Sequence, residues 1–457
     1  MDILPELLSQ LARGGGGGSS GGSGGGGLLE LIGLIGYLPS YYGGMVVKKW
    51  LPRKQELFVS LVAATTISVV LTMTAIHIHD DFGWLVIVFI IIGVWLGWAA
   101  AFFSAWEKIK ARARKTNQQV AEAAHFDSAW NPEKLIEHAR VIFMRYQEDW
   151  SNFNIDSIRT YATESYATHA SLMLRALKEL HRVNSMANVR INDALITDMR
   201  DSVDNQEDAF TVAFNAQALD VLRAENDISK TLYSDTSAFI EYWTFVRRSD
   251  TWLLDAIEQQ TADASAADRE LKSFAQSNGL YYSLDMGWLF LPASGVLFAG
   301  GSFGKSDINN HIIGLYGDNL IQLYTYIDDK EGGSSVTVAQ INLPRSCGGI
   351  SIRRKYSFWS LSPPQAPKPP SSYKRYTFEW PDFNKRYQVA ATDQDRLATF
   401  ELLNPGFMAY LYDKDPGVSI EVADNVVYLY TLTGGTDTKT YQVMLEILNK
   451  THKELRL

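Results

Sequence analysis

The sequence has very little cysteine and no excess of positive charge. Cys347 is the only cysteine among 457 residues, so no internal disulfide can form, which fits a reducing compartment. The formal net charge of −9 argues against a nucleic-acid-binding surface. The first twelve residues include Asp2 and Glu6 and no long apolar core, so we expect neither a secretory signal nor a mitochondrial presequence.

A nucleotide-binding motif is also missing. The nearest sequence is AGGSFGKS at 299–306, in which Ala299 replaces the first glycine of a phosphate-binding loop. That glycine lets backbone amides surround the phosphate, and the residues that follow are strand-like, so a glycine-rich turn is the preferred interpretation. Asp255 could face the interior of a domain, but no acid–base pair can be assigned to it. We therefore expect no enzyme, no catalytic residues and no cofactor.

One short turn combines histidine with carboxylates. His77, His79, Asp80 and Asp81 have the chemistry of a divalent-metal site. Four neighbours on a short turn rarely converge on one ion, and polar residues are expected there in any case. We therefore predict no metal site.

Long apolar runs are what this sequence does have. Residues 57–105 hold two uncharged runs, each about as long as the ~20 residues that a membrane-crossing helix needs, with a short polar turn between them. Lipid offers the backbone no hydrogen-bond partner, so both runs are predicted to be helical. The sequence thus predicts a two-helix transmembrane hairpin.

The charges on either side of this hairpin predict its topology. Lysine and arginine precede the first run and follow the second, whereas the turn carries Asp80 and Asp81. Positive flanks stay in the cytoplasm. We expect a multi-pass protein of the cell inner membrane, in contact with membrane lipids, with both termini and the soluble domains cytoplasmic.

Small residues recur every four positions in both runs, which lets helix backbones approach closely in lipid. The hairpin is predicted to pack through these faces, although the second face could instead form a dimer. The residues are Ser60, Ala64 and Ser68 in the first run, and Gly93, Gly97 and Ala101 in the second.

The approach to the hairpin has two parts. Residues 1–27 are rich in glycine and serine and predict a flexible N-terminus. Residues 28–56 are an apolar but broken segment followed by a basic approach, predicted to lie at the membrane interface. A third span over 28–47 is the alternative.

Beyond a polar stalk at 106–124, the sequence predicts two folded domains. Residues 125–261 place helical periodicity before strand periodicity, which is an α+β order. Residues 262–457 form a second, strand-rich α+β domain with a proline-rich loop at 362–372. The expected fold class is therefore α+β, behind a transmembrane hairpin.

The first of these domains resembles a known family. FDSAWNPEKL at 126–135 and FIEYWTFVRRSDTWLLDAIEQQ at 239–260 resemble the Tim44-like domain, the membrane-facing domain of the tether that recruits the chaperone motor in mitochondrial import. Trp243, Arg247, Trp252 and Leu254 match its closing strand pair. The chain has no long charged N-terminal region of the kind that grips the chaperone, so a chaperone-motor role is not implied.

The resemblance implies a cone of helices against a curved sheet, similar to nuclear transport factor two and ketosteroid isomerase, around an apolar pocket. Five aromatic residues, on one helical stripe and two strands, are the candidate ligand-binding residues: Phe143, Tyr146, Trp150, Phe214 and Trp243. Large side chains could also simply fill a core.

The C-terminal half resembles bacterial domains of unknown function that accompany membrane segments. The likeness rests on FNKRYQV at 383–389 and NPGFM at 404–408, and it implies no activity. Taken together, the sequence predicts a membrane-anchored cytoplasmic scaffold or adaptor with a protein partner, and protein export or membrane-protein assembly is the expected process. The alternative is lipid or apolar-ligand binding by the cone.

Overall fold

The computed structural model divides into two compact units, each described here by itself. The first comprises residues 1–132 and 195–199, and the second comprises residues 133–194 and 200–457. The structure describes these parts of the chain: 36–43, 53–76, 81–103, 105–203, 205–259, 266–299, 302–303, 306–328, 334–355, 367–392, 401–414, 417–431 and 438–455. The predicted flexible segment 1–27, the residues His77, His79 and Asp80, and residues 362–366 of the proline-rich loop lie outside them.

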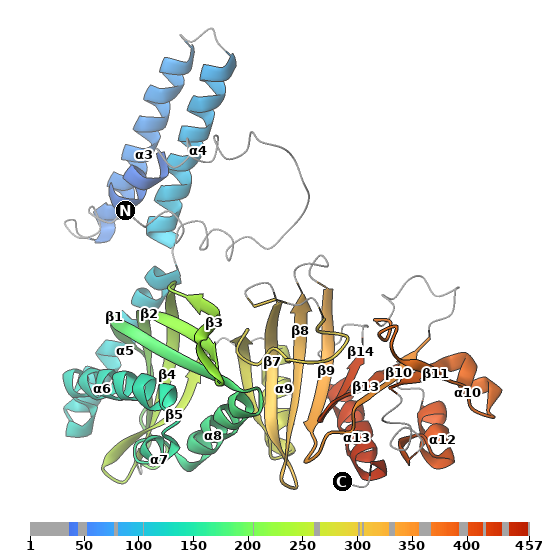
Figure 1. Cartoon of the computed structure of the whole chain (residues 1–457). Helices are drawn as coiled ribbons and strands as arrows, with labels where there is room; N and C mark the ends of the chain where they lie inside the picture. Colours follow the sequence, from blue (N-terminus) through green and yellow to red (C-terminus); the bar gives the residue numbers. More distant parts are fainter. Residues whose placement is uncertain are drawn as a thin grey trace. The chain divides into compact units, whose positions relative to one another are not determined.

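Helices dominate the first unit (Figure 1). A short helix spans 36–43, within the segment predicted to be interfacial. It is followed by α3 (Arg53–Ile76), α4 (Asp81–Phe103), α5 (Ala105–Ala124) and the 3₁₀ turn η1 (Ser128–Trp130). The two helices expected from the apolar runs are thus present as α3 and α4.

The prediction that these helices cross a membrane is wrong. In the part of the chain that the structure describes, no helix has the length and the apolar character for a membrane crossing. A crossing requires ~20 consecutive apolar residues, and neither α3 nor α4 presents such a run among its described side chains. The multi-pass topology depended on that hairpin and is not supported.

The small residues of the hairpin lie in different surroundings. Ala64 on α3 is buried, as are Gly93 and Gly97 on α4. A Cβ atom on Gly97 would lie 2.2 Å from the carbonyl oxygen of Tyr37, so this glycine is approached by the helix at 36–43. The side chains of Ser60 and Ala101 are not described, and the predicted pairing of the two faces stays a prediction.

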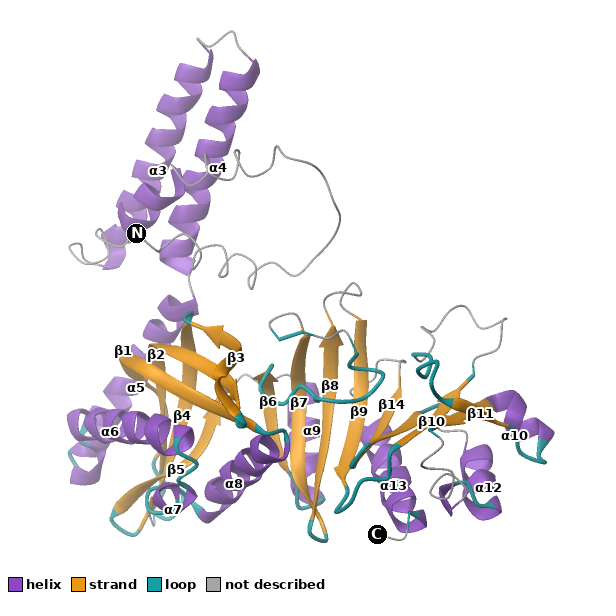
Figure 2. Ribbon diagram, in the orientation of Figure 1, coloured by secondary structure: helices purple, strands orange, loops and turns teal. Residues whose placement is uncertain are grey.

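The cone domain of the second unit combines helices with a curved sheet, as Figure 2 shows. Its strands form a sheet in the order β1-β2-β4-β5, with β3 paired to β2. In chain order the elements are α6 (Pro132–Ser151), α7 (Ile155–Ile158), α8 (Glu164–Glu179), β1 (Arg182–Arg200), β2 (Ala209–Ala224), β3 (Asp227–Asp235), β4 (Ala238–Arg248) and β5 (Thr251–Glu258). The predicted order of helices before strands is confirmed.

A large antiparallel sheet organises the C-terminal domain. The order of its described strands is β11-β12-β10-β13-β14-β9-β8-β7-β6. They are β6 (Tyr281–Gly287), β7 (Ser306–Tyr316), β8 (Asn319–Asp328), β9 (Ser334–Asn342), β10 (Gly349–Arg354), β11 (Lys374–Tyr376), β12 (Tyr387–Ala391), β13 (Ser419–Ala423) and β14 (Val426–Thr431). The strand-rich α+β prediction for this half is confirmed.

The two faces of this sheet are covered differently. The helices α9 (Ala266–Ser277), α12 (Pro405–Lys414) and α13 (Thr438–Glu454) share one apolar core with strand residues such as Ile312 and Leu323. α10 (Pro381–Arg386) adds Phe383 to that core. On the other face the segment 288–299 covers the strands, with the ring of Phe290 stacked on His311 at 5.0 Å.

The cone and the C-terminal domain pack against each other within the second unit. α8 contacts β5 of the cone and β7 of the large sheet. Arg175 on α8 donates a hydrogen bond to the carbonyl oxygen of Asp318 at 2.7 Å, and Asn342 bonds to the carboxylate of Glu179. The boundary predicted between residues 261 and 262 therefore lies inside one compact unit.

A buried ion pair joins β4 of the cone to the start of β2. Arg247 on β4 and Asp208, just before β2, are joined at 3.3 Å, and the carboxylate is fully buried. Asp208 also accepts hydrogen bonds from the backbone N–H and the hydroxyl of Ser202, at 2.7 and 2.8 Å. The Asp208 carboxylate thus binds both strand β4, through Arg247, and the loop between β1 and β2, through Ser202.

Asp208→Ala should lower the free energy of unfolding by about 3–5 kcal/mol, because it leaves the Arg247 guanidinium buried without this counter-charge. Asp250→Ala is the matched control, since Asp250 lies 3.9 Å from the same arginine with a fully exposed side chain. Urea unfolding of both variants measures the difference. Equal stability of the two would show that the buried pair does not stabilise the junction between β4 and β2.

Candidate functional site

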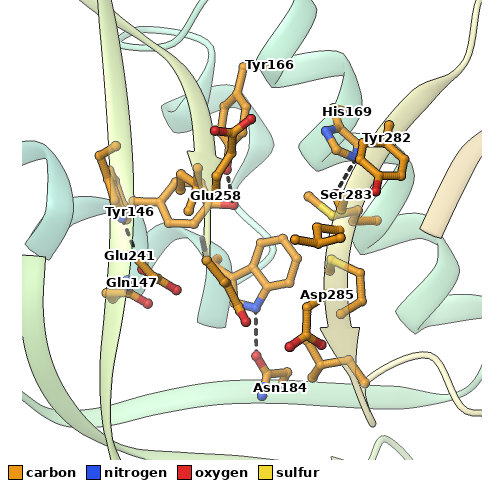
Figure 3. A pocket seen from close by; sticks show the side chains of 18 of the residues that line it. Tyr146, Gln147, Tyr166, His169, Asn184, Glu241, Glu258, Tyr282, Ser283 and Asp285 are labelled. Atoms are coloured by element: carbon orange, nitrogen blue, oxygen red, sulfur yellow. Dashed lines mark hydrogen bonds between the residues drawn. The ribbon is translucent and has the colours of Figure 1, made fainter. Parts of the chain in front are cut away.

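A cavity of about 380 Å³ lies on the inner side of the cone, where the cone meets the C-terminal domain. The cone contributes α6, α8, β1, β2, β4 and β5 to its wall. The C-terminal domain contributes α9 and β6, through residues that include Lys272, Tyr282 and Met286. Figure 3 shows side chains from both domains converging on this space. The cavity thus extends beyond the segment that resembles the Tim44-like domain.

The position of α8 is set at its first turn. Thr163 caps the helix by accepting a hydrogen bond from the N–H of Tyr166 at 3.2 Å, and its hydroxyl donates to Asp255 at 2.9 Å. A capping threonine satisfies a donor that the first helical turn leaves free. The backbone adds two bonds, from Thr163 N to Leu254 O and from Leu254 N to Tyr161 O, at 2.8 and 2.9 Å. These bonds place α8 across the sheet.

Asp255 therefore has a structural role in positioning this helix. The sequence left open whether it faces the interior of the cone. Its carboxylate is bonded to the cap of α8 and does not line the cavity.

The five aromatic residues predicted to bind a ligand lie together. The ring centroids of Phe143 and Trp243 are 4.9 Å apart, and those of Phe143 and Phe214 are 4.5 Å apart. Tyr146 stacks on Trp150 at 5.9 Å and meets the edge of Trp243 at 5.4 Å. Aromatic pairs at such separations stabilise a core beyond the area that they bury.

Only part of this cluster faces the cavity. Tyr146, Trp150 and Trp243 line it, whereas Phe143 and Phe214 are fully buried behind them and do not. The two phenylalanines are core residues. A charged replacement of either would test folding and not ligand binding.

The polar atoms of the aromatic wall are bonded within the wall. Trp150 Nε1 donates to Asn184 at 2.8 Å, and Trp243 Nε1 donates to Glu241 at 3.0 Å. The hydroxyl of Tyr166 donates to that of Tyr146 at 3.0 Å. Because these groups are satisfied, the surface that they offer to the cavity consists largely of apolar rings.

Two carboxyl groups lie on the cavity wall among these rings, and sequence reasoning missed them. Burial raises the pKa of Glu241 to about 7, against a hydrogen bond from Trp243 that lowers it; the nearby charge of Asp220 raises it further. Burial also raises the pKa of Asp220 to about 6, although Asn184 donates to its carboxylate at 2.5 Å. Both groups can therefore become neutral near physiological pH.

A signal for these residues was present in the strand pattern. Phe214, Ala216, Ala218 and Asp220 alternate along β2, and Glu241 stands opposite Phe214 in the register with β4. Residues two apart in a strand share a face. Two acids on the inward face of an otherwise apolar pair of strands are the feature that could have been noticed.

A neutral histidine links the cavity wall to the C-terminal domain. Burial lowers the pKa of His169 on α8 to about 3, and the nearby His311 lowers it further. Its Nε2 lies 3.3 Å from the hydroxyl of Ser283 on β6, and its ring stacks on Tyr281 at 5.3 Å. Figure 3 shows His169 and Ser283 facing each other. Strand β6 thereby closes one side of the cavity.

The rim of the cavity is charged and carries both signs. Lys272 on α9 forms an ion pair with Glu258 on β5 at 3.0 Å, and Tyr282 donates to Asp268 at 3.2 Å. The Asp285 carboxylate accepts the N–H of Gly287 at 2.8 Å. A mainly apolar lining with a few polar groups is the usual form of a small-molecule site.

Metal and nucleotide chemistry have no described site in this chain. Across the described ranges, no three side chains of histidine, cysteine, aspartate or glutamate are placed to hold a metal ion. His77, His79 and Asp80 of the turn considered above are not described. Of the glycine-rich stretch 299–306, Phe303 is described, whereas Gly304 and Lys305 are not.

The raised pKa of Glu241 makes stability depend on pH. The unfolded chain releases this proton near pH 4.5 and the folded chain near 7, so the folded chain binds more protons between these values. The free energy of unfolding contributed by this group therefore falls as the pH rises through that window. Glu241→Gln, which imitates the neutral acid, should stabilise the protein at pH 8 by on the order of 1–3 kcal/mol and leave it unchanged at pH 4.

Thermal melts at pH 4, 6 and 8 measure this effect. Glu137→Gln is the control, because Glu137 is exposed on α6. A gain for Glu241→Gln that does not vary with pH would contradict a titrating carboxyl in the cavity.

Comparison with known proteins gives a family match, reported in the next paragraph, and weak similarity to solved structures. No curated protein matches the chain. Two solved structures to which it is similar are the mycobacterial trehalose monomycolate transport factor A, TtfA, at 15% identity, and the intermembrane-space region of the chloroplast protein ARC6, at 9%. The first covers 42% of this chain and 96% of its own, with a TM-score of 0.32, and the second covers 28% and 97%, with a TM-score of 0.23.

The family model that matches the sequence is that of the Tim44-like domain, over residues 116–259. This range agrees with the resemblance inferred from Trp243, Arg247, Trp252 and Leu254. It covers the stalk end and the whole cone sheet, and it stops before α9 and β6, which close the cavity. Residues 116–259 of this chain are a Tim44-like domain.

Proposed function

We propose that this protein is an adaptor that acts at a membrane and holds an apolar ligand in the cone cavity. The observation that carries the proposal is the cavity of about 380 Å³, with Tyr146, Trp150 and Trp243 in its wall. Its size is that of pockets that bind small molecules, about 300–1,000 Å³. A lipid chain or an apolar segment of a partner protein has the matching chemistry.

The buried carboxyl groups favour this function over charge-based binding. When Glu241 and Asp220 are protonated, they add no charge to the wall. His169 is held neutral by burial and adds none either. A neutral cavity lined by rings gains free energy from apolar contact at ~25 cal/mol per Å² that it removes from water.

The same groups bear on whether the chain is an enzyme. A carboxyl with a pKa of about 7 in a cavity is a candidate general base. Glu241, however, is held by Trp243 Nε1, and neither it nor Asp220 is hydrogen-bonded to a nucleophilic side chain. We therefore propose binding without catalysis.

Exposed apolar side chains in the first unit support contact with a membrane surface or a protein partner. Val62 and Ile67 on α3 and Trp84 and Leu96 on α4 are all about half exposed. Large exposed apolar patches commonly mark such contacts. Together with the Tim44-like domain, these exposed side chains favour an adaptor role. The process that we propose for it is protein export or membrane-protein assembly.

The neutral fluorescent probe N-phenyl-1-naphthylamine should bind the purified full chain saturably. Met286→Trp on β6 places a large ring in the cavity and should weaken the affinity at least about tenfold, or ~1.4 kcal/mol. Met144→Trp is the control, because Met144 is exposed on α6, away from the cavity. Circular dichroism shows whether both variants keep the fold.

The pH dependence of the same titration identifies the carboxyl groups. Binding should be tighter at pH 5.5 than at pH 8.5. An apolar ligand removes water from the carboxyl groups, and this desolvation costs more free energy for a charged carboxylate than for a neutral acid. Glu241→Gln should reduce that dependence.

Unchanged binding by a folded Met286→Trp variant would exclude this cavity as the site. Displacement by a phospholipid or by an apolar peptide then separates the two ligand classes.

A further inference from the structure

A second cavity, of about 470 Å³, lies between the cone and the C-terminal domain at the start of β1. Its apolar wall includes Leu232 from the cone, and Leu291, Phe298 and Tyr326 from the C-terminal domain. Arg182, the first residue of β1, also lines it. This cavity shares no lining residue with the first.

Arg182 is buried to an unusual degree for an arginine, with 5% of its surface exposed. Its Nη1 donates to the carbonyl oxygen of Leu289 at 3.2 Å, and its guanidinium lies over the ring of Phe303 at 4.9 Å. No ion pair joins it to a carboxylate anywhere in the described ranges. Burial lowers its pKa to about 10, so it remains charged at neutral pH.

A buried guanidinium without a carboxylate is costly. It has five N–H donors, and one bond to a carbonyl satisfies one of them. Removing a charge from water costs several kcal/mol unless an opposite charge and hydrogen bonds compensate for it. Arg182 lines this cavity with donors that the Leu289 carbonyl does not take, and the wall combines apolar side chains with polar ones such as Asn226 and Lys230.

The other charged groups around this cavity are at its edge. Lys230 lines the cavity and is exposed, and the nearby Asp227 is exposed as well. His181 lines it too and lies 3.4 Å from the exposed carboxylate of Glu225. The rim acids thus have partners of their own, and the buried charge that lacks one is positive.

We infer that this second cavity binds an acidic amphiphile, with its carboxylate or phosphate on Arg182 and its apolar chain against Leu291, Phe298 and Tyr326. A guanidinium donates two parallel hydrogen bonds to either of these anions. The contact of the guanidinium with the Phe303 ring adds a cation–π attraction that keeps Arg182 beside the cavity. The site is separate from the cone cavity and does not depend on the function proposed for it.

Isothermal titration calorimetry of the full chain with three probes tests the inference. Octanoate has both the anion and the chain, 1-octanol has the chain alone, and inorganic phosphate has the anion alone. Octanoate should bind at least about tenfold tighter than either of the others, since a charge-assisted pair and apolar burial act together. Phosphate binding as tightly as octanoate would overturn the role of the apolar walls.

Variants then locate the site. Arg182→Gln should abolish the preference for octanoate over 1-octanol, whereas Arg182→Lys should keep part of it. Arg190→Gln is the control, because Arg190 is exposed on the same strand. A preference that persists in Arg182→Gln, or one that is lost equally in Arg190→Gln, would overturn the assignment.

Thermal melts without ligand separate binding from a structural role. If Arg182 is kept for a ligand, Arg182→Gln removes an uncompensated charge and should melt at the same temperature as the wild type or higher. A lower melting temperature together with unchanged octanoate binding would show that Arg182 only supports the fold.

Discussion

The cone depends on one short stretch of backbone pairing, in which residues 161–163 bond to Leu254 on β5. This pairing fixes the start of α8, and the cap from Thr163 to Asp255 reinforces it. From that point the helix crosses the sheet and carries His169 and Met173 into the cavity wall. The helix and the strands of the curved sheet line the same cavity, beside a packed core of Phe143, Phe214 and Trp243.

The far half of the same helix serves the other domain. Arg175 and Glu179 bond to residues of the large sheet, and His169 meets β6. The C-terminal domain therefore completes the cavity of the Tim44-like domain, and the two domains form one compact unit. A comparison limited to the family domain would leave out the wall made by α9 and β6.

The two cavities differ in whether their buried ionisable groups can become neutral. A carboxyl group can take up a proton, so Glu241 and Asp220 become neutral where burial is costly. Arginine cannot lose its proton under physiological conditions, so Arg182 stays charged and needs an anion. Burial thus has opposite consequences in the two cavities, because the acids of the first can become neutral and the arginine of the second cannot.

The sequence by itself determined the local elements and the family. Periodicity predicted helices before strands in residues 125–261 and a strand-rich second half, because helix and strand patterns depend on neighbours a few residues apart. Apolar length alone, however, predicted a membrane-crossing hairpin that the described helices do not support. Only the tertiary structure decided which aromatic residues face the cavity, that β6 and α9 close it, and where Glu241 and Arg182 lie. Those features arise from contacts between residues far apart in the chain, and burial sets the protonation of the acids only after such contacts have formed.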